Sequence, residues 1–357
     1  MNAARPAAAP DFAALLAASP DAYPQAVDLV RGLVLVIRMD EAAFRKASFL
    51  DDRILGPATQ GAWLPGDVVS AAARRVADRR PVHFVFHSGH VGSTLLTRLL
   101  DETGAVLSLR EPLPLRTLAE AEEALGRPES LLSADQFDGL LDMLLVLWSR
   151  GYASSRTVVV KATSSAGRLA PRILARAPSS RAVCLSLRAE PYIATLLGGA
   201  NSLIDLRGHA PGRMRRLLAG RELAVPPVHA LSAGELAALG WVTESLAHAA
   251  ARAAAGERVL MIDFENFLGD LPRGLGTVVA HFGLPPDEAF LAAAGGHAVL
   301  RRYSKAPEQP FAPGERGERL AFARREYRDE IARGLAWIGR LARADAGIAA
   351  LAGAGLP

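Results

Sequence analysis

The sequence has almost no cysteine and little lysine. Its 357 residues include one cysteine, Cys184, and its 41 basic residues include only three lysines, Lys46, Lys161 and Lys305. A single thiol forms no internal disulfide and supplies no thiolate cage, which excludes a disulfide scaffold and a zinc finger. The eight histidines show no metal-ligand spacing, and we predict no metal. The preference for arginine is typical of a GC-rich genome, so the few lysines that remain are of more interest.

Long apolar segments are also missing. The best runs, Leu33–Ile37 and Leu140–Trp148, are shorter than the roughly 18 residues that span a bilayer, and the second contains Asp142. Near the N-terminus, Asp11 interrupts the stretch that most resembles the apolar region of a signal peptide. The sequence therefore predicts a cytoplasmic protein with no membrane span.

Neither sign of charge dominates. The formal net charge is +4, with 22% charged and 50% hydrophobic residues, which is the composition of a globular protein with a real core. Because the charges are interspersed, no nucleic-acid partner is required, and a basic pocket for a small anionic molecule fits as well. The length allows two domains, or one large α/β domain with additions. Nothing in the sequence indicates the oligomeric state.

Short apolar runs rich in β-branched residues alternate with helical patterns after Pro81. This alternation predicts a parallel sheet flanked by helices in a three-layer α/β fold. The predicted strands are His83–His87, Ala105–Leu109, Thr157–Lys161, Ala182–Leu187 and Arg258–Ile262. The predicted helices are Val68–Arg79, Leu95–Asp101, Leu132–Trp148, Gly167–Ala177, Glu235–Ala255 and Leu320–Ala342.

The same patterns suggest how the chain is divided. We expect residues 1–79 to form an N-terminal extension packed on the core, residues 80–345 to form the α/β domain with a helical C-terminal segment, and residues 346–357 to form a flexible tail. Two basic segments rich in Gly and Pro, 204–232 and 301–319, are expected to be irregular. The arginines of the first hint at a lid over a ligand or at an acidic small molecule, although a solvated surface explains the composition equally well.

The segment with a chemical signal is HFVFHSGHVGSTLLTRLLDETG, residues 83–104. A predicted buried strand runs into a glycine-containing loop and then directly into a helix, and the amides of such a loop and the positive helix N-terminus bind phosphate groups. The loop departs from the ATP-binding Walker A motif, since Ser93 stands where that motif has lysine and His87 where it has its first glycine. The alternative is an ordinary strand–turn–helix connection in which Ser93 or Thr94 caps the helix.

The loop His90–Thr94 (HVGST) resembles the 5′-phosphosulfate loop of sulfotransferases that use 3′-phosphoadenosine 5′-phosphosulfate (PAPS). In that family a strand leads into Lys/Arg-Ser-Gly-Thr-Thr and then a helix, so His90 and Val91 depart from the pattern. Further similar segments follow in the family's order, and the similarity spans about residues 80–340. The resemblance implies a P-loop-type α/β fold, PAPS as co-substrate without a metal, and a small-molecule acceptor with a hydroxyl or amine.

The resemblance also implies catalytic residues. Glu111, which follows the second predicted strand, matches the family's catalytic base. Lys161, at the end of the third strand, and His90 match the cations that stabilise the transferring group. On their own, Glu111 also reads as a solvated loop acid, Lys161 as a member of a structural ion pair, and His87 as a satisfied histidine at a strand end.

Binding of the donor is implied for a second group of residues. Arg188 matches the arginine that binds the 3′-phosphate, with Thr195 or Ser202 in place of the family's serine. Alternatively, Arg188 pairs with Glu111 or Glu190. The full set of implied cofactor-binding residues is Gly89, His90, Val91, Gly92, Ser93, Thr94, Arg188, Thr195, Ser202 and Lys305.

Two other functions stay open at this point. A P-loop kinase or nucleotide hydrolase would show Mg²⁺-dependent ATP turnover, but the loop lacks the lysine that neutralises the β- and γ-phosphates. A non-catalytic protein that binds a nucleotide or a partner on a degenerate sulfotransferase scaffold is favoured by His90, by Val91 and by Leu196, which occupies the position of the family's serine.

Overall fold

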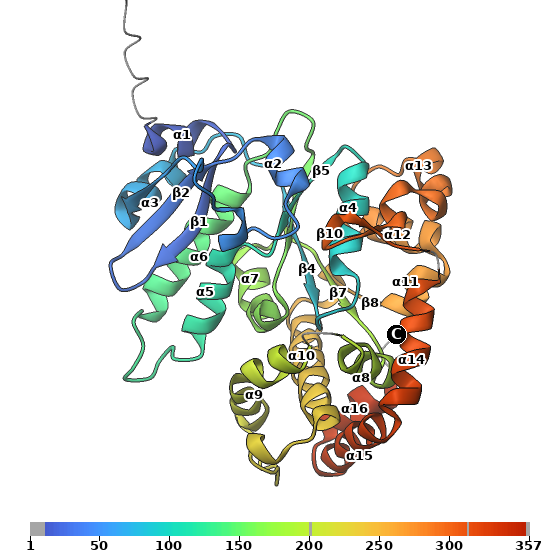
Figure 1. Cartoon of the computed structure of the whole chain (residues 1–357). Coiled ribbons are helices and arrows are strands. Elements are labelled where there is room, and N and C mark those ends of the chain that lie inside the picture. The colour runs from blue at the N-terminus through green and yellow to red at the C-terminus, as the bar shows by residue number, and fades with distance from the viewer. Residues whose placement is uncertain (1–10, 200–201, 313, 355–357) are drawn as a thin grey trace, which may run out of the picture. The chain divides into compact units, whose positions relative to one another are not determined.

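The central element is a parallel sheet of five short strands in the order β5-β6-β4-β7-β8 (Figure 1). The strands are β4 (Val82–His87), β5 (Val106–Arg110), β6 (Thr157–Lys161), β7 (Ala182–Ser186) and β8 (Val259–Asp263). In the register of the sheet, His87 of β4 lies opposite Leu185 of β7, which also pairs in parallel with β8. Every residue of β4 to β7 is buried, as expected for strands covered on both faces. The predicted α/β fold with a parallel sheet is confirmed, and each strand lies within one residue of its predicted bounds.

The computed structural model describes residues 11–199, 202–312 and 314–354. Contacts divide the chain into a first unit, Met1–Val82 with Gly104–Val160, and a second unit, His83–Thr103 with Lys161–Pro357. Most of the sequence-predicted site residues, including those of the loop at 89–94, Lys161, Arg188 and Lys305, therefore belong to the second unit, whereas Glu111 belongs to the first.

In the described part of the first unit, from residue 11 onward, an antiparallel sheet is accompanied by five helices. The strands are β1 (Ala22–Asp28), β2 (Leu33–Arg38) and β3 (Gly61–Pro65), with β2 in the middle, and the helices are α1 (Phe12–Ala18), α2 (Glu41–Lys46), α3 (Gly66–Arg74), α5 (Leu113–Glu122) and α6 (Ala134–Trp148). The buried Arg150, just after α6, donates hydrogen bonds to the carbonyls of Leu16, Ser19 and Ala22. This one guanidinium therefore fastens α1 and the start of β1 to the end of α6.

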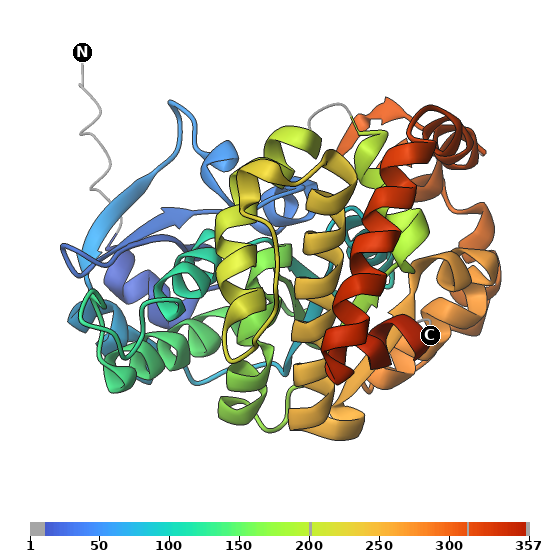
Figure 2. The same ribbon diagram turned by 90° about the horizontal axis from the view of Figure 1, so that it is seen from below.

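The second unit is dominated by helices. They are α4 (Ser93–Glu102), α7 (Ala170–Arg176), α8 (Ala189–Leu197), α9 (Ser202–Leu218), α10 (Ala233–Ala255), α11 (Phe264–Gly269), α12 (Leu271–His281), α13 (Glu288–Ala293), α14 (Glu315–Glu326), α15 (Arg328–Ala344) and α16 (Ala346–Ala354). The long helix α10 begins with a capping box of Ser232 and Glu235 and lies between α9 and α15 (Figure 2). Its Trp241 donates a hydrogen bond to the carbonyl of Leu187 at 2.9 Å, so α10 holds the chain where it leaves β7.

The first half of the segment 204–232, which was expected to be irregular, lies in helix α9, which continues through Pro211. Arg213 and Arg216 of this helix form ion pairs with the buried Glu244 of α10, at 3.5 and 3.0 Å. Contacts with α10 thus offset the low helix propensity of the segment. The prediction that this segment is irregular is wrong for the residues up to Leu218.

The C-terminal region is also more regular than expected. Residues 301–319 contain the hairpin of β9 (Arg302–Tyr303) and β10 (Ala306–Pro310) and the start of α14, and the single helix predicted at 320–342 is interrupted at Tyr327. The expected flexible tail contains α16, which packs on α15 and α10 and buries Ile348 and Leu351. Burial of these apolar side chains orders the segment up to Ala354, so the expectation of a tail is wrong there.

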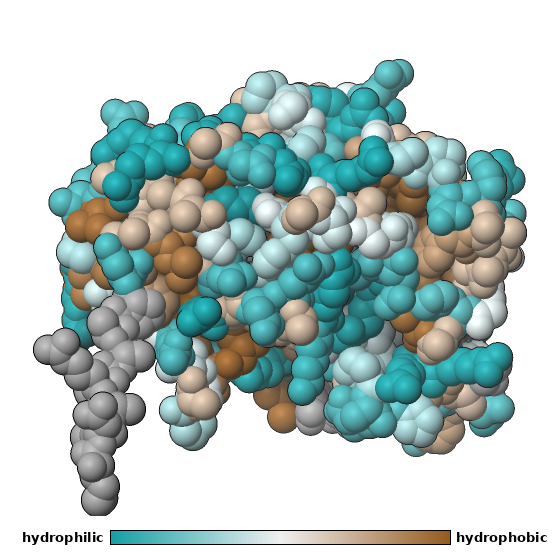
Figure 3. All heavy atoms as spheres, turned by 90° about the horizontal axis from the view of Figure 1, so that it is seen from above, coloured by the Kyte–Doolittle hydropathy of each residue, from teal (hydrophilic) through white to brown (hydrophobic). Residues whose placement is uncertain are grey.

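The face of the molecule drawn in Figure 3 is mostly polar, with apolar patches between the polar side chains. None of the described helices combines the length and the apolar character that crossing a bilayer requires. The described residues also include no group of three or more His, Cys, Asp or Glu side chains placed to hold a metal ion.

Candidate functional site

The loop between β4 and α4 has the backbone of an anion-binding site. Gly89, His90 and Gly92 have positive φ angles of 96°, 56° and 72°, which turn the chain into the helix. Gly92 occupies the N-cap position, and no side chain caps α4. The amides of the first helical turn therefore lack a side-chain acceptor, and the helix dipole adds a positive field at the same place. A side chain at position 92 would clash unless the ring moves, because its Cβ would lie 2.0 Å from Cζ of Phe264.

Buried groups hold this loop in place. Val91 is fully buried, and the hydroxyl of Tyr192 donates a hydrogen bond to the carbonyl of Ser88 at 2.9 Å. Ser93, the first residue of α4, is buried as well. The hydroxyl oxygens of Ser88 and Thr94 are buried and find no hydrogen-bond partner within the described part of the chain. A buried hydroxyl without a partner is costly, and a bound phosphate oxygen would satisfy that of Thr94. The loop therefore fits a phosphate-bearing ligand.

His87, the last residue of β4, links two segments. The Gly89 N–H donates to its Nδ1 at 3.1 Å, so the ring proton lies on Nε2, which donates to the carbonyl of Ala162 at 2.8 Å. Burial lowers the pKa of His87 well below its ordinary value, and the charges of Lys161 and Lys305 lower it further. The ring is therefore neutral near pH 7. The amide of Gly89, which the resemblance counts among the ligand-binding groups, is occupied by this hydrogen bond.

Two of the three lysines lie close enough to His87 for their charges to act on its ring. Lys161 ends β6 and is 1% exposed. Lys305 lies in the turn between β9 and β10, and Arg98 of α4 holds this turn by donating to the carbonyl of Ser304 at 2.7 Å. The second unit thus brings the loop, Lys161 and Lys305 together.

Glu111 follows β5 in the first unit, with a φ of +55°. In the described part of the chain, Glu111 and His90 are the non-glycine residues with positive φ. Such a conformation costs about 1–3 kcal/mol and clusters at functional sites. The backbone around Glu111 is held from one side, since the N–H of Leu50 donates to the carbonyl of Arg110 at 2.7 Å and the N–H of Leu113 donates to the carbonyl of Leu50 at 3.2 Å.

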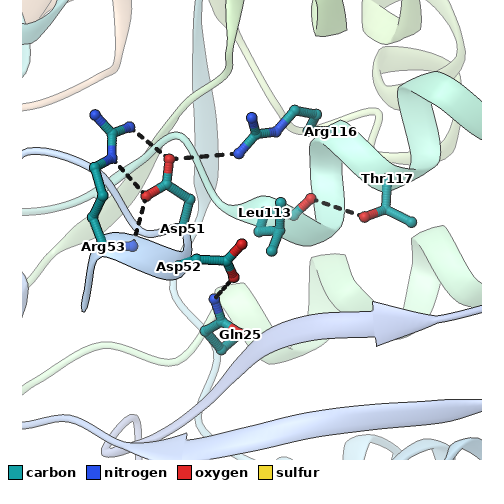
Figure 4. A network of polar contacts seen from close by, with 7 residues as sticks. All are labelled: Gln25, Asp51, Asp52, Arg53, Leu113, Arg116 and Thr117. Atoms are coloured by element: carbon teal, nitrogen blue, oxygen red, sulfur yellow. Dashed lines mark hydrogen bonds and ion pairs between the residues drawn. The ribbon is translucent and has the colours of Figure 1, made fainter. Parts of the chain in front are cut away.

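The segment after Leu50 forms an ion-pair cluster (Figure 4). Asp51 accepts hydrogen bonds from Nε and Nη2 of Arg53 at 2.8 and 2.5 Å, and Nη2 of Arg116 approaches it at 3.5 Å. Burial alone would raise the pKa of Asp51, but the hydrogen bonds and charges of the two arginines hold it below its ordinary value. The hydrogen bond with Asp51 and, to a smaller extent, the charge of Glu111 raise the pKa of Arg53. Glu111 therefore lies within the electrostatic reach of this cluster.

Arg188 is exposed and occupies the N-cap position of α8, just beyond β7. The alternative pairing with Glu190 is absent, because both carboxylate oxygens of Glu190 accept hydrogen bonds from Arg324, at 2.8 and 2.7 Å. Thr195 is half-buried on α8, and Ser202 is buried at the start of α9. Neither hydroxyl is hydrogen-bonded to Arg188 among the residues that the structure describes. The structure therefore does not select a hydroxyl that assists Arg188.

Sequence reasoning missed a buried polar cluster between α9 and α10. Glu244 is fully buried and receives the ion pairs of Arg213 and Arg216, and His248 lies one turn further along α10. Burial lowers the pKa of His248 to about 4, against the opposing charge of Glu244. The available signal was the spacing of Glu244 and His248, four residues apart on an Ala- and Leu-rich helix, which places both on one face.

Comparison with known proteins gives matches among solved structures. No family model matches the chain, and no curated protein has a matching sequence. A sulfotransferase domain from the curacin biosynthetic pathway is 16% identical and matches 73% of this chain and 99% of its own length, with a TM-score of 0.36. A sulfotransferase from Mycobacterium avium is 13% identical over 92% of this chain and 98% of its own length, with a TM-score of 0.37. Retinol dehydratase in a complex with retinol and PAP is 13% identical and matches 80% of this chain and 87% of its own length, with a TM-score of 0.34.

Proposed function

We propose that this chain is a sulfotransferase that moves a sulfuryl group from PAPS to a hydroxyl or amine of a small acceptor. The observation that carries this proposal is the uncapped N-terminus of α4, reached through a loop with positive φ angles and accompanied by Lys161 and Lys305. A cradle of amides and cations of this kind binds anionic groups. The sequence of the loop favours PAPS over ATP, because Ser93 replaces the lysine that a Walker A loop requires.

In the proposed site, the 5′-phosphosulfate binds to the amides of Gly92, Ser93 and Thr94 and to the Thr94 hydroxyl. Lys161, with His90, stabilises the negative charge that develops on the bridging oxygen in the transition state. Transfer of this type needs little covalent chemistry from the protein, as in phosphoryl transfer, because alignment of donor and acceptor and electrostatic stabilisation supply most of the rate.

The acceptor supplies the nucleophile. Its oxygen or nitrogen forms a bond to sulfur while the bond between sulfur and the bridging phosphate oxygen breaks, and Glu111 takes the proton that the nucleophile loses. The leaving group is 3′-phosphoadenosine 5′-phosphate (PAP). A general base contributes about 10²–10⁴-fold to the rate. The positive φ of Glu111 supports this role, since a strained backbone at a non-glycine residue is typical of functional positions.

The 3′-phosphate of the donor is assigned to Arg188, with Thr195 or Ser202 as a second ligand and Lys305 as a further cation of the donor site. Arg188 is exposed and forms no ion pair with a carboxylate among the described residues. A guanidinium in this state can bind a phosphate through two parallel hydrogen bonds.

Calorimetric titration with PAP and an assay with sulfate-labelled PAPS test the proposal, using a panel of small hydroxylated and amino compounds as acceptors. We expect the unmodified chain to bind PAP at micromolar concentration and to label at least one acceptor. The variant E111Q should bind PAP like the unmodified chain and lose about 10²–10⁴-fold in turnover. The variant R188A should weaken PAP binding by about tenfold or more, since a charge-assisted hydrogen bond is lost.

Adenosine 5′-monophosphate is the matched control, because it lacks the 3′-phosphate and should bind R188A and the unmodified chain equally. Binding of PAP without transfer to any acceptor would favour a non-catalytic nucleotide-binding protein. Mg²⁺-dependent turnover of ATP would favour a kinase or hydrolase. An unmodified chain that binds no PAP at millimolar concentration contradicts the proposal.

A further inference from the structure

We infer that His87 is a positioning residue for sulfuryl transfer, which fixes the phosphosulfate loop and the backbone next to Lys161 through one imidazole ring. This inference rests on the proposed function and deepens it, because the resemblance to sulfotransferases assigns no role to this position.

The two hydrogen bonds of the ring join the two parts of the site. Its Nδ1 accepts from the N–H of Gly89, where the sharp turn of the loop begins. Its Nε2–H donates to the carbonyl of Ala162, the residue that directly follows Lys161. The side chain of His87 is almost completely buried, so neither hydrogen bond competes with solvent. A displacement of either segment therefore strains its link to the other.

The bridge requires a neutral ring, because an imidazolium has no lone pair to accept the hydrogen bond from Gly89. Its surroundings keep the ring neutral. Burial disfavours the charged form most, the charges of Lys161 and Lys305 act in the same direction, and the hydrogen bond to Ala162 opposes them. The two lysines assigned to the donor thus also hold the bridging ring in the form that can accept from the loop.

Asparagine and glutamine separate the two links. The side-chain oxygen of His87→Asn can accept from the amide two residues further on, as in an Asx turn, and so keeps the bond to Gly89. The longer side chain of His87→Gln can place its NH₂ near the position of Nε2 and so keeps the bond to Ala162. His87→Leu fills a similar volume and keeps neither link.

Three measurements on these variants test the inference: the Kd for PAP, kcat with PAPS and the best acceptor, and hydrogen exchange of residues 88–94. One net hydrogen bond corresponds to about a 3–10-fold change in an equilibrium or rate. We expect H87N to bind PAP nearly as tightly as the unmodified chain, with slow exchange of the loop, and to lose 3–10-fold in kcat. H87Q should weaken PAP binding by about the same factor and exchange faster in the loop, and H87L should show both losses.

Thermal unfolding of the same variants separates positioning from stability. If all three variants lower Tm alike but keep the PAP affinity, loop exchange and kcat of the unmodified chain, His87 serves packing alone and the inference is wrong. The inference is also wrong if H87N and H87Q lose the same property, for example if both lose PAP affinity and neither loses kcat. An unmodified chain that binds no PAP overturns the proposed function, an outcome that the titration of this chain alone reveals.

Discussion

Gly92 and Gly104 share a left-handed backbone, with φ of 72° and 71°, but their surroundings differ. A Cβ on Gly104 would meet nothing within 4 Å, whereas one on Gly92 would lie 2.0 Å from the ring of Phe264. Alanine at position 104 therefore costs backbone strain alone, about 1–2 kcal/mol. Alanine at position 92 adds a steric clash inside the loop. We expect G92A to have a clearly lower free energy of unfolding than G104A in urea titrations, and to bind PAP more weakly.

The double variant G92A/F264A is the control for this explanation. Removing the ring of Phe264 is itself destabilising by about 3–5 kcal/mol, since the side chain is buried. If the clash is the cause, the two substitutions together cost less than the sum of their separate effects. Equal stabilities of G92A and G104A would show that the ring yields and that the clash has no weight.

The same residues show which parts of the site a sequence can reveal. The course of the loop can be predicted because it follows from a local pattern, an apolar strand followed by glycines and a helix start. The neighbours that fix it cannot, because Phe264, Tyr192 and Ala162 come from distant segments and reach the loop only through the fold. The sequence predicts that His87 is a satisfied histidine, and its two hydrogen bonds confirm this, but only the fold shows that they join the loop to the residue after Lys161.

At the scale of helices, the contact between α9 and α10 depends on one buried carboxylate. Glu244 is fully buried and serves both Arg213 and Arg216 of α9. The substitution E244Q removes the countercharge of two largely buried guanidiniums, and breaking a buried ion pair in this way costs about 3–5 kcal/mol. We expect a corresponding decrease in the free energy of unfolding, together with faster hydrogen exchange in residues 202–218.

An exposed ion pair of the same helix provides the comparison. Arg340 of α15 pairs with Glu235 at 2.9 Å, and the side chain of Arg340 is 52% exposed. Because solvent screens such a pair, R340Q should cost less than about 1 kcal/mol. If E244Q and R340Q had equal effects, the buried cluster would add nothing to the attachment of α9.

Whether a helix or strand could be predicted from the sequence depends on whether local residues or distant ones stabilise it. The buried strands were predicted almost to the residue, since short β-branched runs such as Thr157–Lys161 encode both strand propensity and burial. Helix α9 was missed because Pro211 and many arginines argue against a helix locally, and the partner that holds it, Glu244, lies some thirty residues further on. Helix α16 was missed because its Ala- and Gly-rich sequence has no amphipathic pattern. Its Ile348 and Leu351 are buried only through contacts with other helices, which the sequence does not reveal.

Over the whole molecule, both units bury arginines, whereas all eight histidines belong to the second unit. The first unit buries arginines, as in Arg110 and Arg150, whose guanidiniums donate to several backbone carbonyls. Burial lowers the pKa of Arg150 to about 10, so this side chain stays charged in any mild buffer. The second unit buries Arg213 against Glu244 and also holds the histidines whose pKa values are lowered chiefly by burial, namely His83, His87, His209, His248 and His281.

This difference predicts that mild acid destabilises the second unit. The folded pKa values of His83 and His248 are about 4, below the ordinary value of about 6.5 that the unfolded chain regains. Between these values the unfolded chain binds more protons, so stability is complete above pH 6.5 and decreases as the pH falls toward 4. Near pH 5.5 these two rings alone take up about two protons on unfolding, a slope of about 2.5 kcal/mol per pH unit. Asp51, whose folded pKa is lowered, changes the pH dependence of stability only near and below its ordinary pKa of about 4. Between pH 5 and 7 it therefore does not mask the effect of the histidines.

Urea unfolding at several pH values between 5 and 7 measures this slope. Hydrogen exchange at pH 5 and at pH 7 shows which unit loses stability. We expect the protection factors of the amides in the second unit to fall first as the pH decreases. The variant H248Q should lower the slope by the contribution of about one proton. A stability that stays constant from pH 7 to pH 5 would mean that these imidazoles are hydrated or already charged in the folded chain. That result would also weaken the inference on His87, because its bridge from Gly89 to Ala162 requires the same neutral, buried state.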